Sequence, residues 1–212
     1  MPSKIILLSG RVCAGKSTLA RALHERFGVR HLKTGECLKQ LRPDVPHERE
    51  ALQNAGERLD RETNGRWVLD ALRKVLARED PQVVVVLDCV RIKEQIEAVR
   101  SGYGNRVCHI HLDAPVEVLA GRYKERDSEA IKEFDSYEQV MENATERQVP
   151  SLEHEADVVI SSQRCTKSDV LLRAASHAGL FGRSFERLVD VIVGGQFGSE
   201  GKGQIAAHLA SE

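Results

Sequence analysis

A glycine-rich stretch near the N-terminus has the residue types and spacing that bind a phosphate chain. Residues 10–17 read Gly-Arg-Val-Cys-Ala-Gly-Lys-Ser, which matches the pattern G-x-x-x-x-G-K-[ST]. The glycines permit the left-handed backbone that turns N–H groups inward around an anion, and Lys16 can reach the β- and γ-phosphates. Ser17 offers a hydroxyl to Mg²⁺, so we predict a site for ATP and Mg²⁺. The predicted cofactor-binding residues are Gly10, Cys13, Ala14, Gly15, Lys16, Ser17 and Thr18.

A second polar group follows four consecutive valines at residues 83–86. Asp88 ends this apolar run, Arg91 comes three residues later, and Gln95 follows at four more. A carboxylate there can orient the hydration shell of Mg²⁺, so Asp88 joins Ser17 as a predicted metal residue. Arg91 can hold a second phosphate. Asp is also a favoured helix N-cap, and the two roles are compatible.

Two further groups carry residues that could contact phosphate. In the stretch 34–39, the Thr34 hydroxyl and the Lys39 ammonium could bind an acceptor phosphate, although a helix-capping role explains this stretch equally well. Arg122 and Arg126 lie four apart on one helical face, just before a highly charged stretch that has Arg147 at its end. Such arginines can neutralise a phosphoryl group in transfer, and solvated helix arginines are the alternative.

The composition narrows the class of protein. Of 212 residues, 41% are hydrophobic and 30% charged, with Lys+Arg 31 against Asp+Glu 32. These proportions indicate a globular chain without a net basic surface for nucleic acid. No apolar run reaches the roughly 18 residues of a membrane span, and no secretory signal is evident. We expect a cytoplasmic protein with small-molecule nucleotide partners and neither nucleic acid nor membrane contacts, and a homodimer stays open.

Apolar runs and helix-period stretches alternate along the chain, which is typical of a parallel sheet covered by helices. We predict a three-layer α/β fold with a five-stranded parallel sheet and a short lid over residues 127–148. The predicted strands are 4–9, 29–33, 82–88, 106–112 and 156–160. The predicted helices are 15–27, 48–61, 66–78, 92–100, 115–126 and 167–178. For His109 and His111, which alternate on one strand face, we favour a solvated face over a shared metal.

Residues 1–180 resemble the nucleoside monophosphate kinases at the phosphate loop, the 34–39 stretch and the segment from Asp88 to Gln95. The resemblance implies a P-loop NTPase fold and phosphoryl transfer from ATP to a purine (deoxy)nucleoside monophosphate. Lys39 stands where that family has Arg, and the family's Gly and Pro after the Asp are absent, which argues against AMP as the acceptor. The implied catalytic residues are Lys16, Arg91, Arg122 and Arg126. The implied substrate-binding residues are Thr34, Lys39, Asp88, Arg91, Gln95 and Arg147.

A second glycine loop follows a predicted strand at residues 188–193. Residues 194–203 resemble the N-terminal signature of the adenylosuccinate synthetases, with Ser199 where most of that family has Asp and phage-type variants have Ser. We therefore predict a kinase-like domain over 1–182 and the truncated start of a synthetase-like domain over 183–212, as part of a longer fusion. The alternative function is a catalytically silent nucleotide sensor that regulates the fused synthetase.

A small-GTPase alternative rests on the stretch 166–169, Thr-Lys-Ser-Asp, which matches the guanine-reading pattern [NT]-K-x-D. No D-x-x-G follows the central predicted strand, where a GTPase senses the γ-phosphate. Thr166 and Asp169 also have the spacing of a helix capping pair. We favour the capping interpretation.

Overall fold

The computed structural model describes residues 4–46, 49–125, 136–181 and 202–204. The chain divides into two compact units, Met1–Leu180 and Phe181–Glu212. The predicted domain boundary at 182/183, the predicted strand 188–193 and the second glycine loop up to residue 201 lie outside the described residues, and these predictions stay predictions.

The described strands form one parallel sheet of five, which confirms the predicted fold class. Its order is β2-β3-β1-β4-β5, so the first strand lies at the centre. Leu8 of β1 is in register with Asp88 of β3, and Ser9 is in register with His111 of β4. The carboxyl ends of the three central strands therefore meet beside the phosphate loop, where parallel α/β sheets bind ligands. The strands are β1 (Lys4–Ser9), β2 (Arg30–Lys33), β3 (Val84–Asp88), β4 (Val107–Asp113) and β5 (Val158–Ser161).

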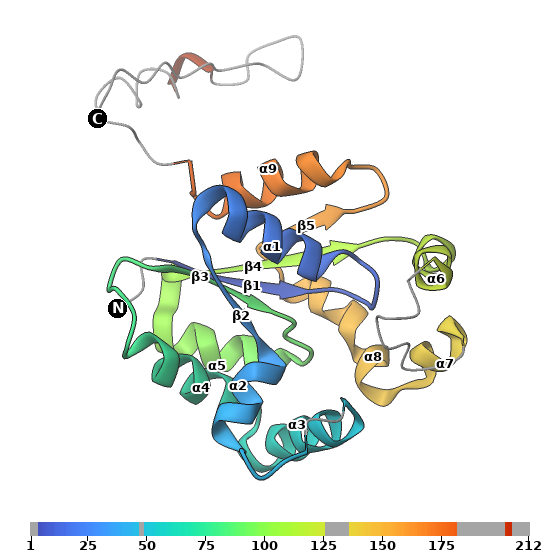
Figure 1. The fold of residues 1–212 in the computed structure, drawn as a ribbon. Helices are drawn as coiled ribbons and strands as arrows, with labels where there is room; N and C mark the ends of the chain where they lie inside the picture. The colour runs from blue at the N-terminus through green and yellow to red at the C-terminus, as the bar shows by residue number, and fades with distance from the viewer. Residues whose placement is uncertain (1–3, 47–48, 126–135, 182–201, 205–212) are drawn as a thin grey trace. The chain divides into compact units, whose positions relative to one another are not determined.

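Helices cover both faces of the sheet, with α1 and α9 on one face and α4 and α5 on the other (Figure 1). Helices α6, α7 and α8 lie beyond the arrowheads of the strands, at the carboxyl edge of the sheet (Figure 1). The α-helices are α1 (Lys16–Phe27), α2 (Thr34–Leu41), α3 (Arg49–Thr63), α4 (Trp67–Leu76), α5 (Lys93–Tyr103), α6 (Val116–Lys124), α7 (Tyr137–Glu142), α8 (Ala144–Gln148) and α9 (Lys167–His177). Two 3₁₀ segments, η1 (Gly104–Arg106) and η2 (Val149–Glu155), precede β4 and β5.

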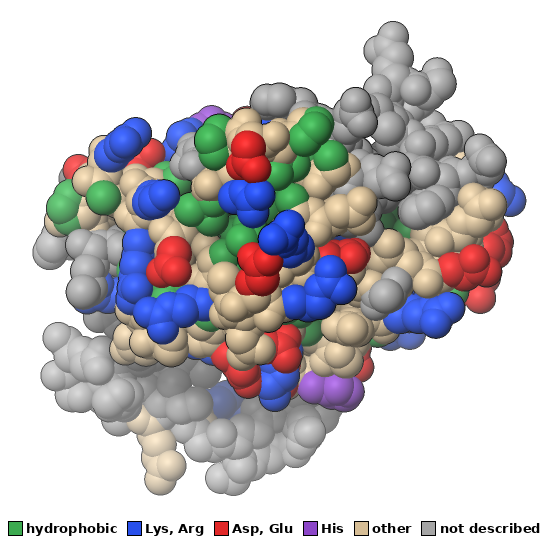
Figure 2. Space-filling view, turned by 90° about the horizontal axis from the view of Figure 1, so that it is seen from below, with side chains coloured by type: hydrophobic (Ala, Val, Ile, Leu, Met, Phe, Trp, Pro, Cys, Tyr) green, Lys and Arg blue, Asp and Glu red, His purple; other side chains and the backbone are tan. Residues whose placement is uncertain are grey.

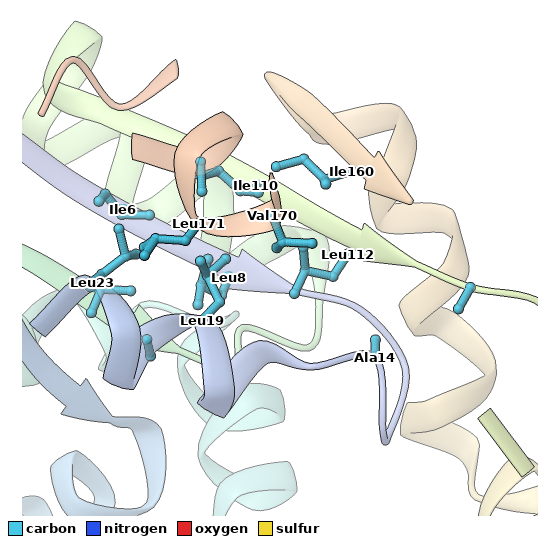
Figure 3. Close-up of a cluster of buried hydrophobic side chains, with 14 of the residues drawn as sticks. Ile6, Leu8, Ala14, Leu19, Leu23, Ile110, Leu112, Ile160, Val170 and Leu171 are labelled. Atoms are coloured by element: carbon cyan, nitrogen blue, oxygen red, sulfur yellow. The ribbon is translucent and has the colours of Figure 1, made fainter. Parts of the chain in front are cut away.

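Two apolar cores lie on opposite faces of the sheet because successive side chains of a strand alternate between its faces. Ile6 and Leu8 of β1 face α1 and α9, where they share one buried cluster with Leu23 and Leu171 (Figure 3). Residues Ile5 and Leu7 of the same strand face the other way, into the core that contains helices α4 and α5. All four β1 side chains are fully buried, which anchors the phosphate loop that follows them.

Several helices begin or end at the residues that the local sequence predicts. Gly28 closes α1 in the left-handed conformation, with φ 66°. The Asn64-Gly65 turn separates α3 from α4, with positive φ at both residues. The Thr166 side chain accepts from the Asp169 N–H, and Asp169 accepts from the Thr166 N–H, which confirms the predicted capping box at the start of α9.

The predicted lid is only partly described, because residues 126–135 lie outside the described ranges. Its remaining part forms α7 and α8. The side chains of Tyr137 and Val140 are buried against the core, and the ring of Tyr137 lies 5.7 Å from that of Tyr123 between centroids. These two side chains join this segment to the core, while most of its charged side chains stay exposed.

Charged side chains of both signs are interspersed over the face seen from below (Figure 2). They do not gather into a single large basic area on this face. Among the described residues, no helix is long and apolar enough to cross a membrane.

The expectation that His109 and His111 form a solvated strand face is wrong. Both side chains are buried, and each contacts the hydroxyl of Ser9 on the adjacent strand β1. Ser9 Oγ lies 2.7 Å from His109 Nε2 and 2.8 Å from His111 Nδ1. His109 Nδ1 lies 3.0 Å from the carbonyl of Glu155, so it carries the proton there. His109 Nε2 then accepts from Ser9, and Ser9 accepts from the Nδ1–H of His111.

This buried chain predicts an acid-sensitive fold. Burial, together with the neighbouring His109, lowers the pKa of His111 from 6.5 to about 4. In the unfolded chain the His111 side chain is therefore protonated below about pH 6.5, whereas in the folded chain it is protonated only below about pH 4. Stability should fall across that window as the pH falls, by about 3 kcal/mol from this residue.

Urea unfolding midpoints between pH 7.5 and 4 measure the effect. His111→Asn keeps an N–H donor for Ser9 but cannot titrate, so its stability should decline less with acidification than that of the wild type. Equal pH profiles for the two proteins would contradict the assignment.

Candidate functional site: a phosphate loop and an adjoining cavity

The phosphate loop connects β1 to α1 through three residues with positive φ, namely Gly10 (136°), Cys13 (66°) and Gly15 (102°). Gly10 has no room for a side chain, because an added Cβ would lie 2.3 Å from the carbonyl oxygen of Leu112. Gly15 is the residue before the first turn of α1, so the loop ends at a helix N-terminus, where N–H groups and the helix dipole favour an anion. The predicted phosphate cradle is therefore formed.

Lys16 and Ser17 lie at the mouth of this cradle. Lys16 Nζ donates to the carbonyl oxygens of Gly10 and Arg11, at 2.6 and 2.9 Å, and so spans the loop. Lys16, Ser17 and Thr18 all line a cavity next to the loop. In this position an ammonium group and a hydroxyl lie beside the space that a phosphate chain would occupy.

Asp88 fits the predicted role beside Mg²⁺. Its side chain is 6% exposed, and its Oδ1 is one of two buried side-chain polar atoms without a hydrogen bond in the described part of the chain. Burial alone would raise the pKa of Asp88, but interactions with His31, Ser17 and Lys16 outweigh burial and lower it. An ionised carboxylate with an open oxygen beside a serine hydroxyl suits the hydration shell of Mg²⁺. The N-cap alternative is wrong, because the N-cap of α5 is Ile92.

His31 is the second residue with an unsatisfied buried atom, and it faces the first. Its Nε2 lies 3.5 Å from Asp88 Oδ2 without forming a hydrogen bond. We expect His31 to orient the Asp88 carboxylate once Mg²⁺ is bound, since residues behind a metal ligand set its position.

His31→Ala should weaken the Mg²⁺ dependence of ATP binding about tenfold and leave Mg²⁺-free nucleotide binding unchanged. Titrations of Mg²⁺ at fixed ATP measure this, with His154→Ala, an exposed histidine of η2, as the control. An unchanged Mg²⁺ dependence in His31→Ala would remove His31 from this role.

The cavity next to the phosphate loop has a volume of about 430 Å³. One side is formed by the loop and the start of α1. The opposite side is formed by the start of α2, by α3 and by the segment after β3. The residues that line it beyond the loop and α1 are Lys33, Thr34, Gly35, Leu38, Leu52, Gly56, Glu57, Asp60, Trp67, Asp88, Cys89, Arg91, Gln95 and Thr145.

Two carboxylates on α3 form a polar end of this cavity that the sequence pattern did not indicate. Asp60 Oδ1 accepts from Trp67 Nε1 at 2.6 Å and from Gln95 Nε2 at 2.9 Å. Glu57, one turn earlier, accepts from the hydroxyl of Thr145 at 3.0 Å. Burial raises the pKa of Asp60. The one local signal for this region is Gly56 in the middle of a helix, where glycine is unfavourable.

The predicted acceptor residues occupy different places. Thr34 lines the cavity, but its hydroxyl donates to the carbonyl oxygens of Asp88 and Cys89, at 2.8 and 2.9 Å, and so joins α2 to the end of β3. Lys39 lies outside the residues that line the cavity, because it is one turn further along α2. Gln95 lines the cavity, and its amide links the N–H of Arg91 to Asp60.

The predicted arginines do not all meet. Arg91 lines the cavity, and its guanidinium lies 3.5 Å from Glu146 of α8. The Arg122 guanidinium donates to the carbonyl of Cys13 and to both oxygens of Ser162, which ties the phosphate loop to the segment after β5. Arg147 is exposed and lines a smaller pocket with Arg11. Arg126 lies outside the described residues, so its predicted role stays a prediction.

The parallel sheet, the phosphate loop after its central strand and the carboxylate at the end of the neighbouring strand define a P-loop kinase fold. Residues 5–153 match a family described as AAA domain. The match spans well over half of the chain, so the chain belongs to this family. No curated protein matches the chain significantly.

Solved structures of small-molecule kinases share the fold. An unliganded sugar kinase from Janibacter sp. HTCC2649 is 18% identical with a TM-score of 0.53, over 85% of this chain and 96% of that chain. A gluconokinase from Sinorhizobium meliloti 1021 is 15% identical with a TM-score of 0.53, over 84% of this chain and 92% of that chain. At these identities the similarity establishes the fold and leaves the substrate open.

Proposed function

We propose that this protein transfers the γ-phosphoryl group of Mg²⁺-bound ATP to a small molecule held in the 430 Å³ cavity. The main support for this proposal is that the phosphate loop and a second set of polar side chains line the same cavity. Lys16 and Ser17 lie on one side, and Glu57 and Asp60 lie on the other. A triphosphate in the loop would therefore present its terminal phosphate directly to the second molecule, as phosphoryl transfer requires.

The acceptor that we propose is a purine (deoxy)nucleoside monophosphate. The cavity volume falls within the usual range of small-ligand sites. Arg91 lines the cavity near the end of β3 and could hold the acceptor phosphate. Leu38, Leu52 and Trp67 supply apolar surface for a base. The sequence resemblance to nucleoside monophosphate kinases over residues 1–180 supports the same class.

In this mechanism the chain contributes orientation and charge. Lys16 moves from the loop carbonyls to the β- and γ-phosphates, and Arg91 balances charge on the acceptor side. Ser17 and Asp88 would hold Mg²⁺, which neutralises charge between the phosphates when bound. No general base is required, because an acceptor phosphate is already ionised at neutral pH. Arg122 and Arg126 complete the proposed catalytic set.

A panel of acceptors tests the proposal. Purified protein with ATP and Mg²⁺ is incubated with each common nucleoside and deoxynucleoside monophosphate, and the products are separated by chromatography, with Lys16→Ala as the control. Formation of ADP and one purine diphosphate, lost in the control, is the expected result. Tight binding of nucleotides without any product would instead favour the regulatory sensor.

We also propose that residues 183–212 begin a synthetase-like domain of a longer fusion in purine nucleotide metabolism. Its support is the resemblance of residues 194–203 to the synthetase signature, and the family match ends at residue 153, before that segment. If the fusion exists, its kinase domain would supply or consume the nucleotide that the synthetase binds.

A further inference from the structure

Charged side chains of both signs line the cavity. The cations are Lys16, Lys33 and Arg91, and Asp88 lies beside the phosphate loop. Glu57 and Asp60, three residues apart on one face of α3, add two further carboxylates. A molecule whose anionic group binds Lys16 or Arg91 would therefore also reach the carboxylates of α3. Carboxylates accept hydrogen bonds, so the part of the molecule beside α3 should carry hydrogen-bond donors.

Asp60 is held so that one oxygen remains for such a donor. Its described hydrogen bonds both go to Oδ1, from Trp67 and from Gln95. Within the described residues nothing donates to Oδ2. Two donors on one oxygen fix the plane of the carboxylate, and the Gln95 amide is itself held by the N–H of Arg91. A carboxylate fixed in this way recognises a ligand by direction. The Asp60 side chain cannot rotate away from a ligand group that has no hydrogen to donate.

The surface beside Asp60 suits a flat ring. Leu38, Leu52 and Trp67 line the cavity there, and Gly56 lies one turn before Asp60 on α3. A Cβ on Gly56 would meet nothing closer than Leu38 Cδ1 at 3.8 Å, so packing within the protein does not require glycine. Glycine inside a helix costs about 1 kcal/mol relative to alanine. Its effect here is to leave the cavity wall open where a ring could lie.

Resting on the proposed kinase function, we propose that Asp60 selects a guanine-type base on the acceptor monophosphate. Guanine presents two adjacent donors, N1–H and the 2-amino group, and Oδ2 of Asp60, to which no described residue donates, would accept from such an edge. Adenine presents an acceptor nitrogen beside its amino group, cytosine does the same, and uracil and thymine flank one N–H with carbonyl oxygens. Each of these bases would place a lone pair against the half-buried carboxylate, which is unfavourable where water is partly excluded.

The test compares kcat/KM for GMP, dGMP, IMP and AMP in the wild type and in Asp60→Asn. The wild type should prefer the guanine nucleotides over AMP by about 100-fold or more, with IMP between them because it has N1–H but no 2-amino group. Asp60→Asn keeps an oxygen for Trp67 and Gln95 and replaces the open acceptor with a donor. It should reduce kcat/KM for GMP about 100-fold, mainly by raising KM. The ratio of kcat/KM for GMP to kcat/KM for AMP should therefore become smaller.

Asp70→Asn is the matched control, because that carboxylate is exposed on α4 and pairs with Arg73. It should leave both the ratio and the rates unchanged. ATP binding and the urea midpoint of Asp60→Asn establish that the variant is folded.

The outcomes separate this inference from the proposed function. Preferential turnover of AMP, or an unchanged GMP-to-AMP ratio in Asp60→Asn, would overturn the selectivity and leave the nucleotide kinase intact. Gluconate, assayed beside the nucleotides, serves as a non-nucleotide acceptor. Its phosphorylation without turnover of any nucleotide would overturn both the inference and the nucleotide class. No ADP with any acceptor would overturn the kinase itself.

Discussion

Replacing Lys16 with alanine should lower the turnover of phosphoryl transfer by about a thousandfold, the usual scale for a charge-stabilising donor at the reacting group. The ammonium group lies at the phosphate loop and already spans its carbonyls at 2.6 and 2.9 Å. Charge on the phosphoryl oxygens is redistributed along the reaction, and a preorganised cation is worth most inside a cavity that excludes water. Affinity for ATP should decline far less, because the backbone N–H groups of the loop remain.

Steady-state turnover with the best acceptor and equilibrium binding of ATP measure the two effects separately. Lys124→Ala, which removes an exposed lysine of α6 outside the cavity, is the control and should change neither. Because Lys16 also bonds to the loop, circular dichroism and the urea midpoint check that the variant is folded. Turnover within tenfold of the wild type would exclude Lys16 from the chemistry.

Replacing Gly10 with alanine should destabilise the fold by about 4 kcal/mol, among the largest losses expected of a single substitution. The added Cβ would lie 2.3 Å from the carbonyl oxygen of Leu112 on β4, a backbone atom that cannot move alone. The residue also has φ 136°, where a side chain strains the backbone. Relief would require β1 to separate from β4, and these are two strands at the centre of the sheet.

Urea unfolding followed by circular dichroism measures this loss. Gly121→Ala is the matched control, because Gly121 lies within α6 and an added Cβ there meets nothing within 4 Å. Alanine is the better helix former by up to about 1 kcal/mol, so Gly121→Ala should be neutral or stabilising. A similar midpoint for the two variants would show that the close approach at Leu112 relaxes easily.

The sequence alone determined the features whose causes lie within a few residues of one another. The phosphate loop, the Asn64-Gly65 turn and the capping pair of Thr166 and Asp169 are each set by local backbone preferences and local hydrogen bonds. The alternation of strands and helices follows from the period of the apolar residues, and it was sufficient for the fold class.

The tertiary structure decided where side chains go once distant segments meet. His109 and His111 alternate as a solvated face would, but the hydroxyl of Ser9, a hundred positions earlier in the chain, makes their burial possible. Thr34 has the type of a phosphate ligand, yet the end of β3 takes its hydroxyl. In both cases the partner comes from another strand, and no local pattern encodes which strand that is.

The acceptor end of the cavity depends most on tertiary structure. Asp60, Trp67 and Gln95 come from three successive helices, and each alone is an ordinary helix residue. They form one network because the sheet order places β3 between β2 and β1 and brings α3, α4 and α5 together below it. The sequence could indicate the phosphate donor because its loop is contiguous, whereas the acceptor site exists only once the helices have packed.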